Sequence, residues 1–182
     1  MTSTDTNLND IVTLETEAAR LLTESGHCAQ TSFSVLNDYF ELDAAGTLKA
    51  LTPMPGIALR GEVCGAVTGA LLALGLVFGR DQLDDLAGFQ RSLPPARSFC
   101  RLFESQHGSL QCRDILLKEF GRSFDLAKSS DFVEYLNCGG HEKCTVVVQS
   151  AVSLAAEQII KGQLEESSTS SLGPDRGVML TA

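Results

Sequence analysis

The stretch GEVCGAVTGALLALGLVFGR, Gly61 to Arg80, decides the fold because it is apolar, rich in small residues and bounded by charges. Its uncharged run, residues 63–79, is shorter than the roughly 20 residues that a membrane-spanning helix needs. Glycine and alanine recur along the run, so neighbouring helices can approach its backbone closely. We therefore expect a buried central helix over residues 62–78 and no insertion into a membrane.

Apolar residues recur at helical spacing through much of the remaining chain. This periodicity predicts further helices over residues 8–23, 27–42, 81–92, 96–106, 110–120 and 141–161. Pro94 and Pro95 should end one helix before the next begins, because proline removes a backbone donor. Residues 121–138 should form a less regular connection. No segment shows the sustained alternation of a half-buried strand, so we predict an all-α, single-domain bundle around the central helix.

The folded domain is expected to span residues 8–163. Residues 1–7 and the Ser- and Thr-rich tail, 164–182, offer little to bury and are predicted to be disordered. The opening sequence MTSTDTNLND lacks the basic and apolar regions of a secretory signal, which predicts a cytoplasmic protein.

The formal net charge of the chain is -9 at pH 7. A chain this acidic is repelled by phosphate backbones and by anionic lipid surfaces. We therefore expect no nucleic-acid partner.

The chain has six cysteines, which in a reducing compartment indicate metal binding, redox chemistry or packing rather than disulfides. Four of them lie in the first turn or so of a predicted helix, shortly after a glycine: Cys28, Cys64, Cys112 and Cys144. Unpaired N–H groups and the helix dipole stabilise a thiolate at this position. Any one of the four, taken alone, fits core packing better than chemistry. Their shared position points to a common site.

No C-x-x-C pair or zinc-finger spacing is present, so the four thiols must converge in three dimensions. Their separations of 36, 48 and 32 positions place one on each of four helices, which suits a site at one end of a bundle. Cys100 lies mid-helix and should fill core volume, whereas the role of Cys138 stays open. His141 shares a helix face with Cys144, so it is either a further ligand or an exposed histidine.

These residues also carry a family resemblance. The chain resembles a redox-active family called C_GCAxxG_C_C, which has a CGAxxG motif and three further cysteines. The motif reads CGAVTG over residues 64–69, and the segments HCAQTSFSVL, QCRDIL and HEKCTVVVQSAV supply the other three cysteines. The resemblance covers about residues 26–160. It implies a helical domain whose four cysteines act together, as a redox group or as ligands of an iron–sulfur cluster; without C-x-x-C-H, no covalent haem is expected.

Three hypotheses follow. In the first, Cys28, Cys64, Cys112 and Cys144 hold an iron–sulfur cluster, most simply [2Fe–2S], for electron transfer with an unidentified redox partner. Four soft ligands also suit zinc or copper(I). In the second, an enzyme without a metal exchanges thiols and disulfides through Cys64 as the reactive thiol. The third is a structural or zinc-binding helical protein. A homodimer formed through the thin central helix is a further hypothesis.

Overall fold

The computed structural model describes residues 3–42, 44 and 46–171. Within these residues the only regular elements are helices, accompanied by one isolated antiparallel bridge between Val63 and Gln111. The all-α prediction is therefore confirmed. The helices are α1 (Ser3–Ser25), α2 (Cys28–Phe40), α3 (Thr47–Ala50), α4 (Gly56–Leu59), α5 (Gly65–Phe78), α6 (Leu86–His107), α7 (Cys112–Phe120), α8 (Ser129–Asn137) and α9 (Gly140–Ser171).

The central helix of the bundle is α5, which packs against α2, α6 and α9. Its small residues allow this close packing: Ala66, Ala70 and Ala73 are fully buried. At Gly69, an added Cβ would lie 2.2 Å from the Ala29 carbonyl oxygen, so α2 can approach only a glycine here. The second half of α5 is less covered than the sequence suggests, because Leu72 and Leu76 are exposed.

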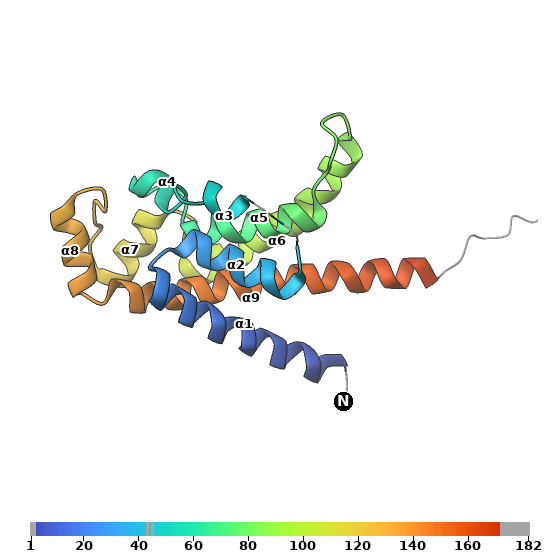
Figure 1. Ribbon diagram of the computed structural model, residues 1–182, viewed down its shortest axis with the longest axis horizontal. Helices are drawn as coiled ribbons and strands as arrows, with labels where there is room; N and C mark the ends of the chain where they lie inside the picture. The colour runs from blue at the N-terminus through green and yellow to red at the C-terminus, as the bar shows by residue number, and fades with distance from the viewer. Residues whose placement is uncertain (1–2, 43, 45, 172–182) are drawn as a thin grey trace, which may run out of the picture.

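The short helices α4, α7 and α8 gather at one end of the bundle (Figure 1). At the opposite end, α9 extends beyond the helices that cover it (Figure 1). The long helices α1 and α9 pack against each other, and α1 also contacts α2. This arrangement brings the beginnings of α2, α5, α7 and α9 to the end where the short helices lie.

The prediction of a break at Pro94 and Pro95 is wrong, because α6 runs through both residues. The prolines remove the hydrogen-bond donors to the carbonyls of Gln90 and Arg91. Both of these residues are exposed, so water can satisfy their carbonyl oxygens. The helix can therefore continue without a buried, unpaired backbone group.

The connection expected over residues 121–138 contains a helix, α8. This nine-residue helix buries little, since Tyr135 is its one buried residue. At the two ends, α1 begins at Ser3 and α9 continues to Ser171, so both helices extend past residues 8 and 163, the bounds expected for the folded domain. Residues 1–2 and 172–182 lie outside the described residues, so their predicted disorder stays a prediction.

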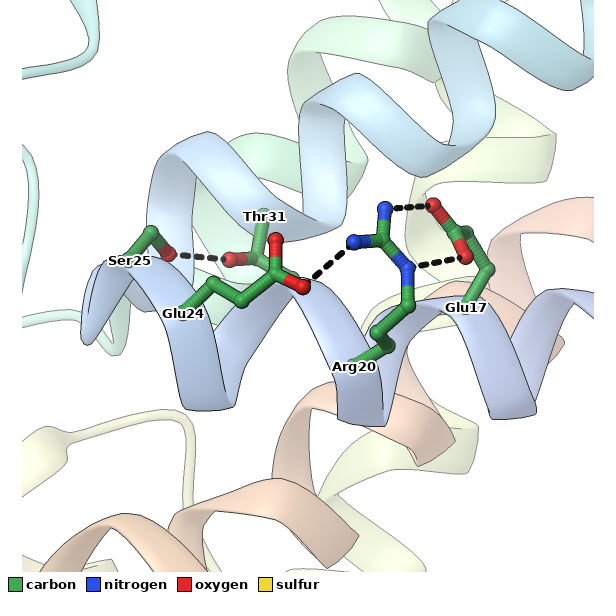
Figure 2. A network of polar contacts seen from close by, with 5 residues as sticks. All are labelled: Glu17, Arg20, Glu24, Ser25 and Thr31. Atoms are coloured by element: carbon green, nitrogen blue, oxygen red, sulfur yellow. Dashed lines mark hydrogen bonds and ion pairs between the residues drawn. The ribbon is translucent and has the colours of Figure 1, made fainter.

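The joint between α1 and α2 sets the direction in which α2 begins. Gly26 adopts a left-handed φ of 63° just after α1 ends. The Ser25 hydroxyl lies 3.0 Å from the Thr31 hydroxyl, which ties the end of α1 to the first turns of α2 (Figure 2). On the exposed side of α1, Arg20 pairs with Glu17 and Glu24 (Figure 2). Exposed pairs of this kind add little stability.

None of the helices in the described part of the chain combines the length and hydrophobicity that a bilayer crossing requires.

Candidate functional site

One pocket at the end where α4, α7 and α8 gather is lined by four cysteines, Cys28, Cys64, Cys112 and Cys144. It encloses a cavity of about 80 Å³. The remaining lining is mostly apolar and aromatic, and among the described residues that line it none is a lysine or arginine. The structure thus brings together the four cysteines that the sequence singles out, although they lie far apart along the chain.

Each of the four thiols lies near the beginning of a different helix. Cys28 is the first residue of α2, Cys112 is the first residue of α7, and Cys64 is the N-cap of α5. Cys144 lies one turn into α9, which begins at Gly140. In the first turn of α5, the backbone N–H groups of Ala66 and Val67 hydrogen-bond to the Cys64 sulfur.

Two backbone hydrogen bonds hold the beginnings of α5 and α7 side by side. The Cys64 N–H donates to the Leu110 carbonyl at 2.8 Å, and the Cys112 N–H donates to the Glu62 carbonyl at 2.7 Å. These bonds accompany the isolated bridge described above. The backbone alone therefore fixes the positions of Cys64 and Cys112 relative to each other.

The glycine that follows Cys64 explains part of the CGAVTG motif. A Cβ at Gly65 would lie 2.4 Å from the Cys28 sulfur and 3.0 Å from the Pro55 Cα. Only glycine leaves room for that sulfur against the first turn of α5. Thr68 has a local role, since its hydroxyl donates to the Gly65 carbonyl at 3.0 Å.

The pocket wall formed by α4 has an unusual backbone. All four residues of this turn have positive φ: Gly56 at 53°, Ile57 at 47°, Ala58 at 57° and Leu59 at 62°. The left-handed conformation is unfavourable for residues that carry a Cβ, by roughly 1–2 kcal/mol each. Gly56 and Leu59 line the pocket, so this strained turn forms part of the site.

The contact between Cys64 and Cys28 shifts their pKa values in opposite directions. The pKa of Cys64 lies below the ordinary cysteine value, because the Cys28 thiol donates to its sulfur and the N–H groups of Ala66 and Val67 add to this effect. The same contact, together with burial, raises the pKa of Cys28. Cys64 is therefore the member of the pair that most readily becomes a thiolate.

The other two thiols are held in their protonated form. Burial raises the pKa of Cys144 to about 11. Burial, followed by the charge of Cys64, also raises the pKa of Cys112. Four thiolates together are thus strongly disfavoured in this pocket as it stands.

One comparison with known proteins gives a match. A family model described as "Putative redox-active protein (C_GCAxxG_C_C)" matches residues 26–158. The chain belongs to the C_GCAxxG_C_C family. The matched range includes all four pocket cysteines. Neither the curated proteins nor the solved structures compared with the chain give a match.

Tyr135 is a pocket residue that the sequence did not reveal in this C_GCAxxG_C_C protein. It comes from α8, and its hydroxyl donates a hydrogen bond to the Cys144 sulfur at 3.2 Å. The one sequence signal nearby is the pair Gly139-Gly140. A Cβ at Gly140 would lie 2.3 Å from the tyrosine ring, so this glycine admits the ring.

The two histidines beside pocket cysteines have different surroundings. His27 caps α2: its Nδ1 accepts from the Gln30 N–H at 3.2 Å, and its Nε2 lies 3.0 Å from the Thr52 carbonyl oxygen. These contacts occupy both ring nitrogens. His141 lines the pocket, with its ring edge-on to that of Tyr135 at a centroid distance of 6.0 Å.

The remaining two cysteines lie apart from the pocket lining. Cys100 is partly buried in α6, and burial raises its pKa. Cys138 is exposed at the end of α8. Both serve as natural controls, because each is a cysteine of the same protein outside the site.

The pocket can be tested against the requirements of a metal centre. In the described residues, no three side chains of His, Cys, Asp or Glu are already arranged to hold a metal ion. Metal binding would therefore require some of the cysteine side chains to turn from their present arrangement. The donor set nevertheless fits chemically, since four thiols in one pocket match the ligands of an iron–sulfur cluster.

Proposed function

We propose that this C_GCAxxG_C_C protein transfers electrons through an iron–sulfur cluster, most simply [2Fe–2S], held by Cys28, Cys64, Cys112 and Cys144. The observation that carries the proposal is that four thiols from four helices line one pocket. Four cysteine thiolates meet the ligand requirement of such a cluster. When bound, the cluster would accept and release one electron without proton transfer.

The electrostatics of the pocket support a positively charged occupant. Metal ligation needs deprotonated thiols, yet burial raises the pKa of Cys28, Cys112 and Cys144. The described lining residues include no lysine or arginine that could compensate four negative charges. Iron ions would supply that compensation, because a bound cation stabilises the thiolate form of its ligands.

The chain's own groups would then tune and protect the centre. Backbone N–H groups of Ala66 and Val67 already lie close enough to lower the pKa of Cys64. Such donors stabilise negative charge on a ligating sulfur. The apolar lining, which includes Leu116, Phe124 and Val148, would restrict the access of water.

A second candidate function is thiol–disulfide exchange, which the Cys28–Cys64 contact favours. The Cys64 thiolate would attack a substrate disulfide, forming a mixed disulfide and releasing one substrate thiol. Cys28 would then lose its proton and attack the Cys64 sulfur. This step releases the second substrate thiol and leaves a Cys28–Cys64 disulfide. Two electrons pass to the substrate, and a dithiol reductant would restore the pair.

Purification under anaerobic conditions distinguishes these functions. The cluster proposal predicts a brown protein with iron and acid-labile sulfide in equal amounts. Cys112→Ser should lose both, because a ligand is removed, whereas Cys100→Ser should keep both. A colourless protein without metal, in which Cys28 and Cys64 are oxidised reversibly to a disulfide, would support the second candidate. Stoichiometric zinc without iron would contradict both and support a structural site.

A further inference from the structure

Tyr135 occupies a closely packed aromatic cluster beside the pocket. Its ring centroid lies 5.9 Å from that of Phe120 and 5.9 Å from that of Phe124, and the ring of Phe132 lies 6.3 Å away. The residue is 5% exposed. The ring is therefore held from several sides, and its hydroxyl has a defined direction.

The backbone of α9 also fits against this ring. A Cβ at Gly140 would lie between 2.3 and 2.5 Å from three ring carbons of Tyr135. The first residue of α9 therefore has to be small for the ring to reach its place. The hydroxyl then lies 3.2 Å from the sulfur of Cys144, one turn further along α9.

We propose that Tyr135 is a positioning residue that donates a hydrogen bond to the Cys144 sulfur and raises the reduction potential of the four-cysteine site. This inference rests on the proposed function, because the potential belongs to the cluster that the four cysteines would hold. Hydrogen bonds to ligating sulfurs are among the factors that set such potentials.

The direction of the effect follows from charge. Reduction adds one electron to the site and makes its sulfurs better hydrogen-bond acceptors, so a fixed donor favours the reduced form. A tyrosine hydroxyl ordinarily has a pKa of about 10, so the Tyr135 hydroxyl keeps its proton at neutral pH and remains a donor. The bond to Cys144 would persist while a one-electron reductant supplied the electron.

Tyr135→Phe tests the inference because it removes the hydroxyl and leaves the ring in the aromatic cluster. The chain offers a matched control in its other tyrosine, since Tyr39 is 40% exposed and does not line the pocket. Dithionite titration of the anaerobically purified proteins measures the midpoint potential. We expect a more negative midpoint in Tyr135→Phe and an unchanged midpoint in Tyr39→Phe.

The iron and sulfide contents distinguish a failure of the inference about Tyr135 from a failure of the proposed function. A Tyr135→Phe protein that keeps its cluster and its midpoint would overturn the inference and leave the proposed function standing. Loss of the cluster from this variant, with helicity and melting unchanged, would overturn it as well, because Tyr135 would then be needed for binding.

If the natural protein contains no iron, the proposed function fails and the hydrogen bond is tested on the thiol itself. Iodoacetamide should then alkylate Cys144 several-fold more slowly in Tyr135→Phe than in Tyr39→Phe. The reason is that the donor stabilises the Cys144 thiolate, and the thiolate fraction outweighs the smaller change in nucleophilicity. Equal rates, measured by peptide mass spectrometry, would overturn the inference.

Discussion

Replacing Gly65 by alanine should destabilise the protein, although alanine is the better helix former. The new Cβ would lie 2.4 Å from the Cys28 sulfur, 3.0 Å from the Pro55 Cα and 3.1 Å from the Ala29 nitrogen. Favourable separations between non-bonded heavy atoms are about 3.5–4.0 Å, so the first contact must lengthen by roughly 1 Å or more. Two of the three neighbours are backbone atoms, so the beginnings of α2 and α5 would have to separate.

Overpacking of this kind costs about 1–3 kcal/mol. Gly65 is the first residue of α5, where the gain in helix propensity is small, so we expect a net loss of about 1–2 kcal/mol. For a chain of this length, the loss corresponds to a decrease in Tm of about 2–8 °C. Displacement of the Cys28 sulfur should also lower the iron content of the anaerobically purified protein.

The same helix provides the control. A Cβ added at Gly75 would have no atom of a neighbouring helix within 4 Å, so Gly75→Ala should instead raise the stability by about 0.5–1 kcal/mol. Urea unfolding, followed by circular dichroism, measures both variants. An equal increase in stability for Gly65→Ala and Gly75→Ala would refute the close approach of Cys28 to α5.

Three further predictions concern the metal-free protein and the turn beside the pocket. The free energy of unfolding of the metal-free protein should decrease above about pH 8.5, where the cysteines of the unfolded chain lose their protons. In the folded protein, the raised pKa values of Cys28, Cys112 and Cys144 keep these thiols protonated. Cys64 acts in the opposite direction, but one thiol against three still leaves a net loss of stability. Equal free energies of unfolding in urea at pH 7 and pH 10 would contradict this. Among the pocket cysteines, Cys64 should be alkylated at the lowest pH, because its pKa is lowered, and a profile shared with Cys144 would show that the Cys28 contact is ineffective. Ala58→Gly should stabilise the protein by about 0.5–1 kcal/mol, since relief of the left-handed strain exceeds the entropic cost of glycine; a lower melting temperature would argue against that strain.

Local sequence signals were sufficient to predict most of the helices and the shared position of four cysteines. Each of these thiols lies near a helix beginning that a glycine precedes, and glycine breaks are readable from one sequence. The small residues of the central segment likewise predict α5, because they permit close helix packing. The family resemblance is now shown, over a range that contains these residues.

Features that depend on contacts distant in sequence could not be predicted. The continuity of α6 through Pro94 and Pro95 depends on the exposure of the carbonyls one turn earlier, which the sequence does not specify. Tyr135 is the one buried residue of a nine-residue helix, and no neighbouring residue in the sequence marks it as part of a pocket. Its hydrogen bond with Cys144 arises only when α8 packs on α9.

The order of the thiol pKa values also required the structure. Cys28, Cys64 and Cys112 all begin or cap a helix, which alone would lower the pKa of each. Burial reverses this effect for Cys28 and Cys112, whereas the hydrogen bond from Cys28 preserves it for Cys64. Sequence position therefore identified the candidate thiols, and the pocket determined how each would ionise.

The central claim is that Cys28, Cys64, Cys112 and Cys144 act as one site that holds a cluster. Native mass spectrometry of the anaerobically purified chain tests it most directly, because the intact mass reports bound iron, sulfide and lost thiol protons together. The account predicts an added mass of two irons and two sulfides with four protons lost, present in Cys100→Ser and absent from each of the four pocket variants. An unmodified mass, or a cluster retained when any of the four cysteines is replaced by serine, would contradict it.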